Sequence, residues 1–96
     1  MNTKPAAAEM VREINTDVRI DVTTDWDRNT IVTIGTDRFV IGDEYEDDEI
    51  VAWTWTTYAA SIDAPEDWEM ISTDGTDDAE QARAALADWS KAALAH

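Results

Sequence analysis

The run Ile50-Val-Ala-Trp-Thr-Trp-Thr-Thr-Tyr-Ala59 is the longest strand candidate in the chain. Its β-branched and aromatic residues fit a pleated, half-buried surface. Side chains alternate between the two faces of a strand, so Val51, Trp53 and Trp55 share one face. The other face carries hydroxyl groups, on Thr54, Thr56 and Tyr58. This pattern favours packing of the two indoles in a core, with a binding platform as the alternative.

Shorter strand candidates lie on both sides of this run. Val18 to Val22 alternates apolar and polar residues with a period of two, which is typical of a half-buried strand. Gly35-Thr36-Asp37 predicts a three-residue hairpin loop, and residues 25–29 predict a turn. Because the connections between strands are short, the sheet is expected to be antiparallel. The expected strands are residues 18–22, 30–34, 38–41, 50–59 and 68–72, the last after a loop around Pro65.

Helical patterns stand at both ends of the chain. Residues 5–14 begin with Pro5, which suits a first helical position, and Met10 and Ile14 fall on one face. Residues 78–95 carry an apolar stripe at helical spacing, formed by Ala82, Leu86, Trp89 and Ala93. Asp77, with Glu80 three positions later, is expected to cap this second helix, and Leu86 and Trp89 are expected to be buried.

The element order predicts the fold class. A helix, four or five antiparallel strands and a second helix make a two-layer α+β domain with both helices on one face of the sheet. The 96 residues suffice for one such domain, so residues 1–96 are expected to form a single unit.

Charge is the compositional feature that bears most on function. Twenty-two acidic residues stand against seven basic ones, a net charge of −15. Spread evenly over about 5,500 Å² of folded surface, these carboxylates would lie about 16 Å apart. That spacing exceeds the Debye length of about 8 Å at physiological salt, so only clustered acids create a strong local field.

Two acidic clusters are the candidate partner-binding residues. The first has six acids in the seven residues 43–49 and is expected to be a solvated loop, because like charges this close repel. The second coincides with the start of the second helix, where the helix dipole favours acids without any partner. The candidate residues are Asp43, Glu44, Glu46, Asp47, Asp48 and Glu49, with Asp74, Asp77 and Asp78 in the second cluster.

Several kinds of chemistry are not expected. There is no Cys, and the only His is His96, so a thiol or serine mechanism lacks its nucleophile or base. The acidic run lacks the spacing and the Gly of a calcium loop. No apolar run approaches the ~18 residues of a membrane span. We therefore expect no enzyme, no cofactor, no metal, no membrane and no direct nucleic-acid binding, and we expect a cytosolic monomer or small homo-oligomer without a signal peptide.

Three functions remain compatible with the acidity. An acidic face can imitate nucleic acid and occupy the binding cleft of a basic enzyme, where complementary charge speeds association. The same physics serves an immunity protein, an antitoxin or another acidic adaptor of a basic protein. The Asp-, Thr- and Ala-rich, Lys-poor composition also fits a small protein adapted to high salt.

Four segments of the first half carry a family resemblance: residues 10–14, 30–32, 39–41 and 46–50. Together they resemble the opening of a small phage-encoded anti-CRISPR family. That resemblance implies a helix followed by three antiparallel strands. It also implies inhibition of a CRISPR nuclease, in the host cytosol, by imitation of the DNA next to its target. After Ile50 the chain departs from the family, because an aromatic strand stands where that family continues into helices.

Overall fold

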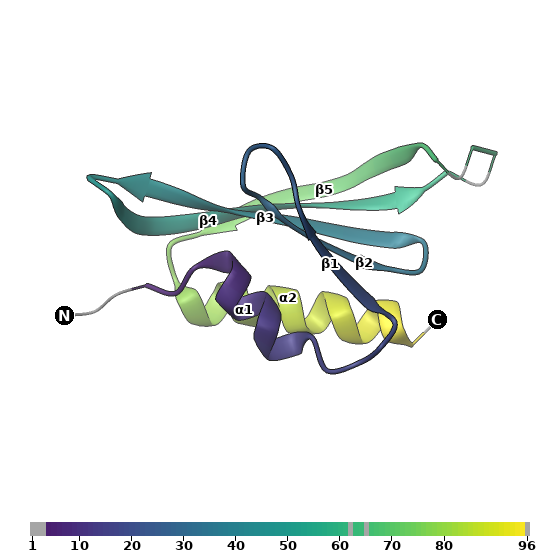
Figure 1. The fold of residues 1–96 in the computed structure, drawn as a ribbon, viewed down its shortest axis with the longest axis horizontal. Helices are drawn as coiled ribbons and strands as arrows, with labels where there is room; N and C mark the ends of the chain where they lie inside the picture. Colours follow the sequence, from purple (N-terminus) through teal and green to yellow (C-terminus); the bar gives the residue numbers. More distant parts are fainter. Residues whose placement is uncertain (1–3, 62, 65, 96) are drawn as a thin grey trace.

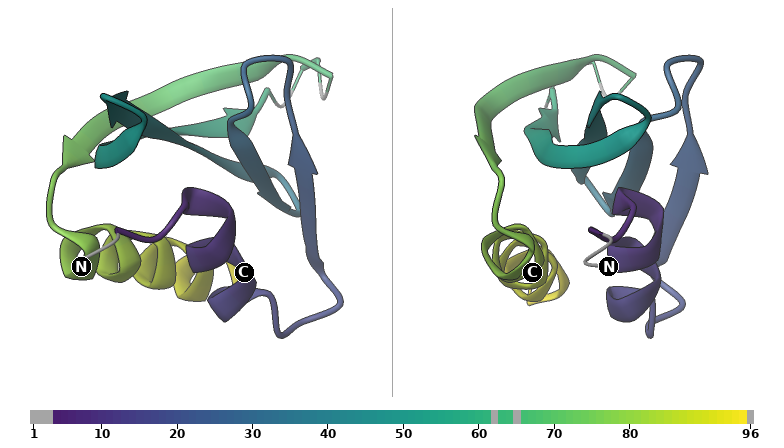
Figure 2. Two further views of the ribbon diagram at one scale, coloured as in Figure 1. Left: turned by 60° about the vertical axis from the view of Figure 1, so that its left-hand side comes forward. Right: turned by 90° about the vertical axis from the view of Figure 1, so that its left-hand side faces the viewer.

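The computed structural model describes residues 4–61, 63–64 and 66–95 (Figure 1). Five strands form one antiparallel sheet in the order β1-β2-β3-β4-β5, and both helices lie on the same face of it (Figure 2). The expected two-layer α+β fold is confirmed. His96 and Pro65 lie outside the described residues. The elements are α1 (Ala7–Ile14), β1 (Ile20–Thr24), β2 (Thr30–Ile34), β3 (Asp37–Glu46), β4 (Glu49–Ala60), β5 (Trp68–Thr76) and α2 (Ala79–Leu94).

The first strand begins two residues later than predicted. Val18 is fully exposed, in a turn that precedes β1. Asp17 explains the delay, because its carboxylate accepts hydrogen bonds from the backbone N–H of Arg19 at 2.9 Å and from the Arg19 guanidinium. These local bonds compete with the sheet ladder and hold the chain in a turn.

The β2–β3 loop has two residues, not the predicted three. Ile34 pairs with Asp37, which leaves Gly35 and Thr36 in the turn. Gly35 has a φ of 59° at the first loop position. Two-residue hairpin loops favour Gly there because it adopts positive φ without steric cost.

The prediction of a solvated loop at residues 43–49 is wrong. β3 continues through Glu46, β4 begins at Glu49, and Asp47 and Asp48 form a two-residue turn with φ values of 51° and 66°. Asp tolerates this left-handed conformation better than most residues. Exposed like charges interact weakly in water. The backbone ladder therefore extends the hairpin despite the charges.

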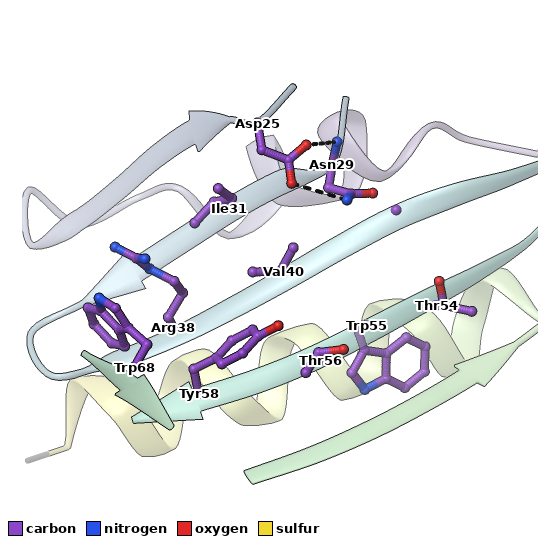
Figure 3. Close-up of a pocket in the computed structure, with 11 residues that line it drawn as sticks. Asp25, Asn29, Ile31, Arg38, Val40, Thr54, Trp55, Thr56, Tyr58 and Trp68 are labelled. Atoms are coloured by element: carbon purple, nitrogen blue, oxygen red, sulfur yellow. Dashed lines mark hydrogen bonds between the residues drawn. The ribbon is translucent and has the colours of Figure 1, made fainter. Parts of the chain in front are cut away.

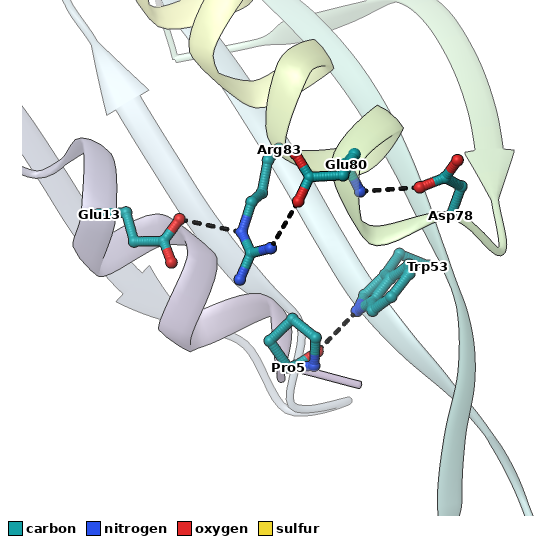
Figure 4. A network of polar contacts seen from close by, with 6 residues as sticks. All are labelled: Pro5, Glu13, Trp53, Asp78, Glu80 and Arg83. Atoms are coloured by element: carbon teal, nitrogen blue, oxygen red, sulfur yellow. Dashed lines mark hydrogen bonds and ion pairs between the residues drawn. The ribbon is translucent and has the colours of Figure 1, made fainter. Parts of the chain in front are cut away.

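The core lies between the sheet and the helices. Trp53 is fully buried, and its indole Nε1 donates to the backbone oxygen of Pro5 at 3.1 Å (Figure 4). Trp55 is half-buried and stacks on the buried ring of Phe39, with ring centroids 6.1 Å apart. The expected packing of both tryptophans into the core is therefore confirmed.

The second helix departs from the prediction at its cap and at Trp89. Asp78, not Asp77, is the N-cap, since its Oδ1 accepts from the backbone N–H of Glu80 at 2.9 Å (Figure 4). Leu86 is buried as predicted, but Trp89 is only partly buried. The prediction of a buried Trp89 therefore holds only in part: the side chain packs against the core, with its ring centroid 5.2 Å from that of Phe39.

Candidate functional site

The acidic tip, defined here as residues 44–49, is the end of the β3–β4 hairpin. Every residue in it is exposed. Glu46 and Glu49 are directly paired across the two strands. Like charges in that position destabilise a sheet. The tip therefore carries an electrostatic cost inside the folded chain.

The ion pairs that the structure describes lie away from this tip. Within residues 4–61, 63–64 and 66–95, none of the ion pairs involves the tip. One joins Arg19 to Asp17, and Arg83 bridges the two helices through Glu13 and Glu80 (Figure 4). The carboxylates of the tip are thus available to a partner.

The charge density of the tip approaches that of DNA. From Glu44 to the turn at Asp47 the hairpin advances about 10 Å, at ~3.3 Å per residue. Five carboxylates project along this length, one for about every 2 Å. Duplex DNA carries one charge per ~1.7 Å of axis, and one strand carries one per ~3.4 Å. The tip therefore has a local charge density close to that of DNA, which charges spread evenly over the surface would not reach.

Asp43 has a different environment from its neighbours. It is half-buried, and its Oδ1 accepts a hydrogen bond from the backbone N–H of Ala7 at 2.7 Å. Ala7 is the first residue of α1, and the helix has no side-chain cap of its own. Asp43 thus takes the place of a cap from a distant strand, and the geometry separates it from the exposed tip.

The second predicted cluster divides in the same way. Asp78 caps α2, and Asp74 accepts from the backbone N–H of Gly75 at 2.8 Å. Asp77 is exposed, and its backbone oxygen accepts from Lys4 Nζ. Two of these three carboxylates therefore have structural partners.

The fold brings both clusters to one end of the molecule. Trp53 pairs with Asp43 on one side and with Thr76 on the other. The chain thus leaves β5 for α2 beside the base of the acidic hairpin (Figure 1). At this end the β3–β4 hairpin extends past the connection from β5 to α2 (Figure 1).

Two exposed aromatic residues were missed in the sequence. Trp26 is fully exposed in the β1–β2 turn, and Tyr45 is 62% exposed on the hairpin. A hollow of about 300 Å³ between the two elements is lined by the turn residues Asp27, Arg28 and Asn29 and by Asp43 and Tyr45. The sequence could have indicated the exposure of Trp26, because a Trp between two Asp in a turn has no core to pack into.

The turn that carries Trp26 is tightly hydrogen-bonded. Asp25 Oδ1 accepts from the backbone N–H groups of Asp27 and Asn29, both at 2.9 Å, and Oδ2 accepts from the Asn29 amide at 3.1 Å. The bonds from Asn29 hold the pKa of Asp25 below its usual value. Trp26 is therefore presented on an ordered support, which lowers the entropy lost when a partner covers it.

The described residues also bear on two other kinds of site, a membrane span and a metal site. Neither helix is long and apolar enough to cross a membrane. Within the described ranges, no group of three or more acidic or His side chains is arranged to hold a metal ion. Protein-family models, curated proteins and solved structures show no match to this chain. A function for it therefore rests on its own residues and their geometry.

Proposed function

We propose that the protein is a DNA-mimic inhibitor whose acidic tip occupies the nucleic-acid-binding cleft of a basic host enzyme, such as a CRISPR or restriction nuclease. One observation carries the proposal. The tip concentrates carboxylates at nearly the density of DNA phosphates, and among the described residues none of these carboxylates forms an ion pair.

The tip departs from the local rules that the rest of the hairpin follows. It sets Glu46 opposite Glu49 and places two residues other than Gly at positive φ. Such departures persist mainly at functional sites. In a complex, Arg and Lys of the client would donate charge-assisted hydrogen bonds to these carboxylates and turn an unfavourable arrangement into a favourable one.

Tyr45 lies in the tip, and Trp26 belongs to the β1–β2 turn, whose residues 27–29 share a hollow with Tyr45. Binding energy concentrates in a few anchors, and Trp and Tyr are enriched among them. An exposed indole beside carboxylates suits Arg, because a guanidinium stacks on the ring while the acids accept its hydrogen bonds. The surface thus offers both the charge and the contact area that a basic cleft requires.

The proposal is tested with purified CRISPR and restriction nucleases in a DNA-cleavage assay. The protein should inhibit cleavage by its client, and excess duplex should relieve the inhibition. The triple variant Asp47→Asn, Asp48→Asn, Glu49→Gln should stay folded and bind the client at least about 100-fold more weakly, since each charged hydrogen bond contributes about 1.5–3 kcal/mol.

A matched control separates the site from bulk charge. Asp21→Asn, Glu69→Gln and Asp88→Asn neutralise three exposed acids on other elements. Both triple variants change the net charge from −15 to −12, since −15 + 3 = −12. The control should bind within a few-fold of the wild type. Equal losses in the two variants, or a ternary complex with DNA still in the cleft, would contradict the mimicry.

The salt dependence of folding distinguishes DNA mimicry from adaptation to high salt. A halophilic protein of this charge needs molar salt to screen its self-repulsion. A decoy from an ordinary host should give a cooperative thermal melt at low ionic strength as well as in molar NaCl. A domain that folds only in molar salt would assign the acidity to salt adaptation.

A further inference from the structure

The face of the sheet away from the helices holds a groove of about 340 Å³ (Figure 3). Ile31 of β2 and Val40 of β3 are paired neighbours and form its apolar floor. Tyr58 and Trp68 rise from β4 and β5 at one end (Figure 3). Apolar floors with a few polar groups and volumes of about 300–1,000 Å³ are typical of small-molecule sites.

The other end of the groove is closed by the β1–β2 turn. Asn29 lies so close to Gly42 that a Cβ there would come within 2.2 Å of the Asn29 Oδ1. A side chain at position 42 would therefore displace the Asn29 amide from this end of the groove. Asp25 holds Asn29 in place through the hydrogen bonds already described (Figure 3).

Arg38 is held at the Trp68 end of the groove. Its Nε donates to Thr33 Oγ1 at 3.2 Å, and its guanidinium carbon lies 4.0 Å from the centre of the Trp68 ring. The side chain is half-buried, yet among the described residues no carboxylate pairs with it. A guanidinium held in this way, whose terminal nitrogens donate no hydrogen bond to the part of the chain that the structure describes, is preorganised to bind an anion in a two-point contact.

We infer that this groove binds a small organic acid, with the carboxylate on Arg38 and a flat apolar body on Ile31 and Val40. Charge complementarity carries the inference. The chain has 22 acidic residues, yet none of those that the structure describes pairs with this half-buried cation, so a ligand carboxylate supplies the partner. The Tyr58 hydroxyl points over the floor and offers a second polar contact (Figure 3).

The inference does not depend on the proposed inhibition. Neither the residues of the acidic tip nor Trp26 line this groove. An organic acid can therefore bind here whether or not the tip has a nuclease as its client, and the two proposals fail separately.

The test is an NMR titration of the ¹⁵N-labelled protein with indole-3-acetate and, as a neutral probe of the same shape, indole-3-acetamide. The acid should shift the signals of Arg38 Nε–H and Trp68 Nε1–H saturably. The amide should bind about tenfold more weakly, because it cannot form the charge-assisted pair. Equal affinities, or shifts confined to other residues, would overturn the inference.

Variants check that Arg38 itself is responsible. Arg38→Gln should remove the preference for the acid, whereas Arg12→Gln, on an exposed part of α1, should leave it unchanged. Arg38→Lys keeps the charge but loses the planar fork, so its preference should be intermediate and should also report on Arg38 if the Gln variant fails to fold. A preference retained in both Arg38 variants would refute the assignment.

Discussion

Replacing Asp43 by Ala should destabilise the protein by about 1–2 kcal/mol. The change removes the acceptor of a 2.7 Å hydrogen bond to the first backbone N–H of α1. Loss of a helix cap costs about 1 kcal/mol, and loss of a negative charge at a helix N-terminus adds about 0.3–1 kcal/mol. Asp43→Asn keeps an acceptor oxygen and loses only the charge, so it should cost about 0.3–1 kcal/mol.

Urea unfolding followed by tryptophan fluorescence measures these differences. Glu44→Ala is the matched control, because Glu44 is the next residue of β3 and is exposed. It should change the free energy of unfolding by less than about 0.5 kcal/mol. If Asp43→Ala matches the wild type, or if Glu44→Ala costs as much, Asp43 does not cap the helix and belongs with the exposed acids.

Three further predictions concern the rest of the fold. Asp48→Gly should raise the free energy of unfolding by about 1 kcal/mol in the same urea assay, because Gly relieves the positive φ; an unchanged or lower stability would contradict this. Asp17 should titrate in a ¹³C NMR experiment with a pKa of about 2, held low by hydrogen bonds from Arg19, and Arg19→Gln should return it toward 3.8. Since the folded pKa is lowered, the stabilisation is present above the unfolded value and is lost as the pH falls through about 2; an Asp17 pKa that ignores Arg19→Gln would refute the pairing. Trp53→Ala should cost about 3–5 kcal/mol and Trp89→Ala clearly less, because Trp53 is fully buried and Trp89 only partly, and the reverse order would be inconsistent with this core.

The fold was predictable where burial alone sets the pattern. The strand at residues 30–34 and the stripe of α2 show the periods of two and of 3.6 that one buried face produces. The ends of elements were less predictable, because local hydrogen bonds and ladder pairing decide them. Asp17 delays β1 in this way, and backbone pairing carries β3 through the acidic run.

The acidic cluster was visible in the sequence, but the sequence did not show that one of its acids caps a helix while the others are exposed. Asp43 and Glu44 are neighbours of the same chemical type on opposite faces of β3, and the partner of Asp43 comes from α1, 36 residues away in the sequence. The groove was hidden for the same reason. Arg38 and Trp68 come into contact only when β3, β4 and β5 pair. The spacing of residues along the sequence therefore does not predict this contact.

The strand β4 explains how an acidic tip and an anion-binding groove can exist in one small protein. Glu49 begins β4 in the tip, and Tyr58 lies in the groove. These nine steps along a strand correspond to about 30 Å. That distance is several times the Debye length of about 8 Å at physiological salt. The charges of the tip are therefore screened at Arg38, and an organic anion bound there meets the local guanidinium, while the Asp25 carboxylate lines the opposite end of the groove. As the ionic strength falls, this screening weakens, so the affinity of the groove for a carboxylate should fall while that of the tip for a basic client should rise.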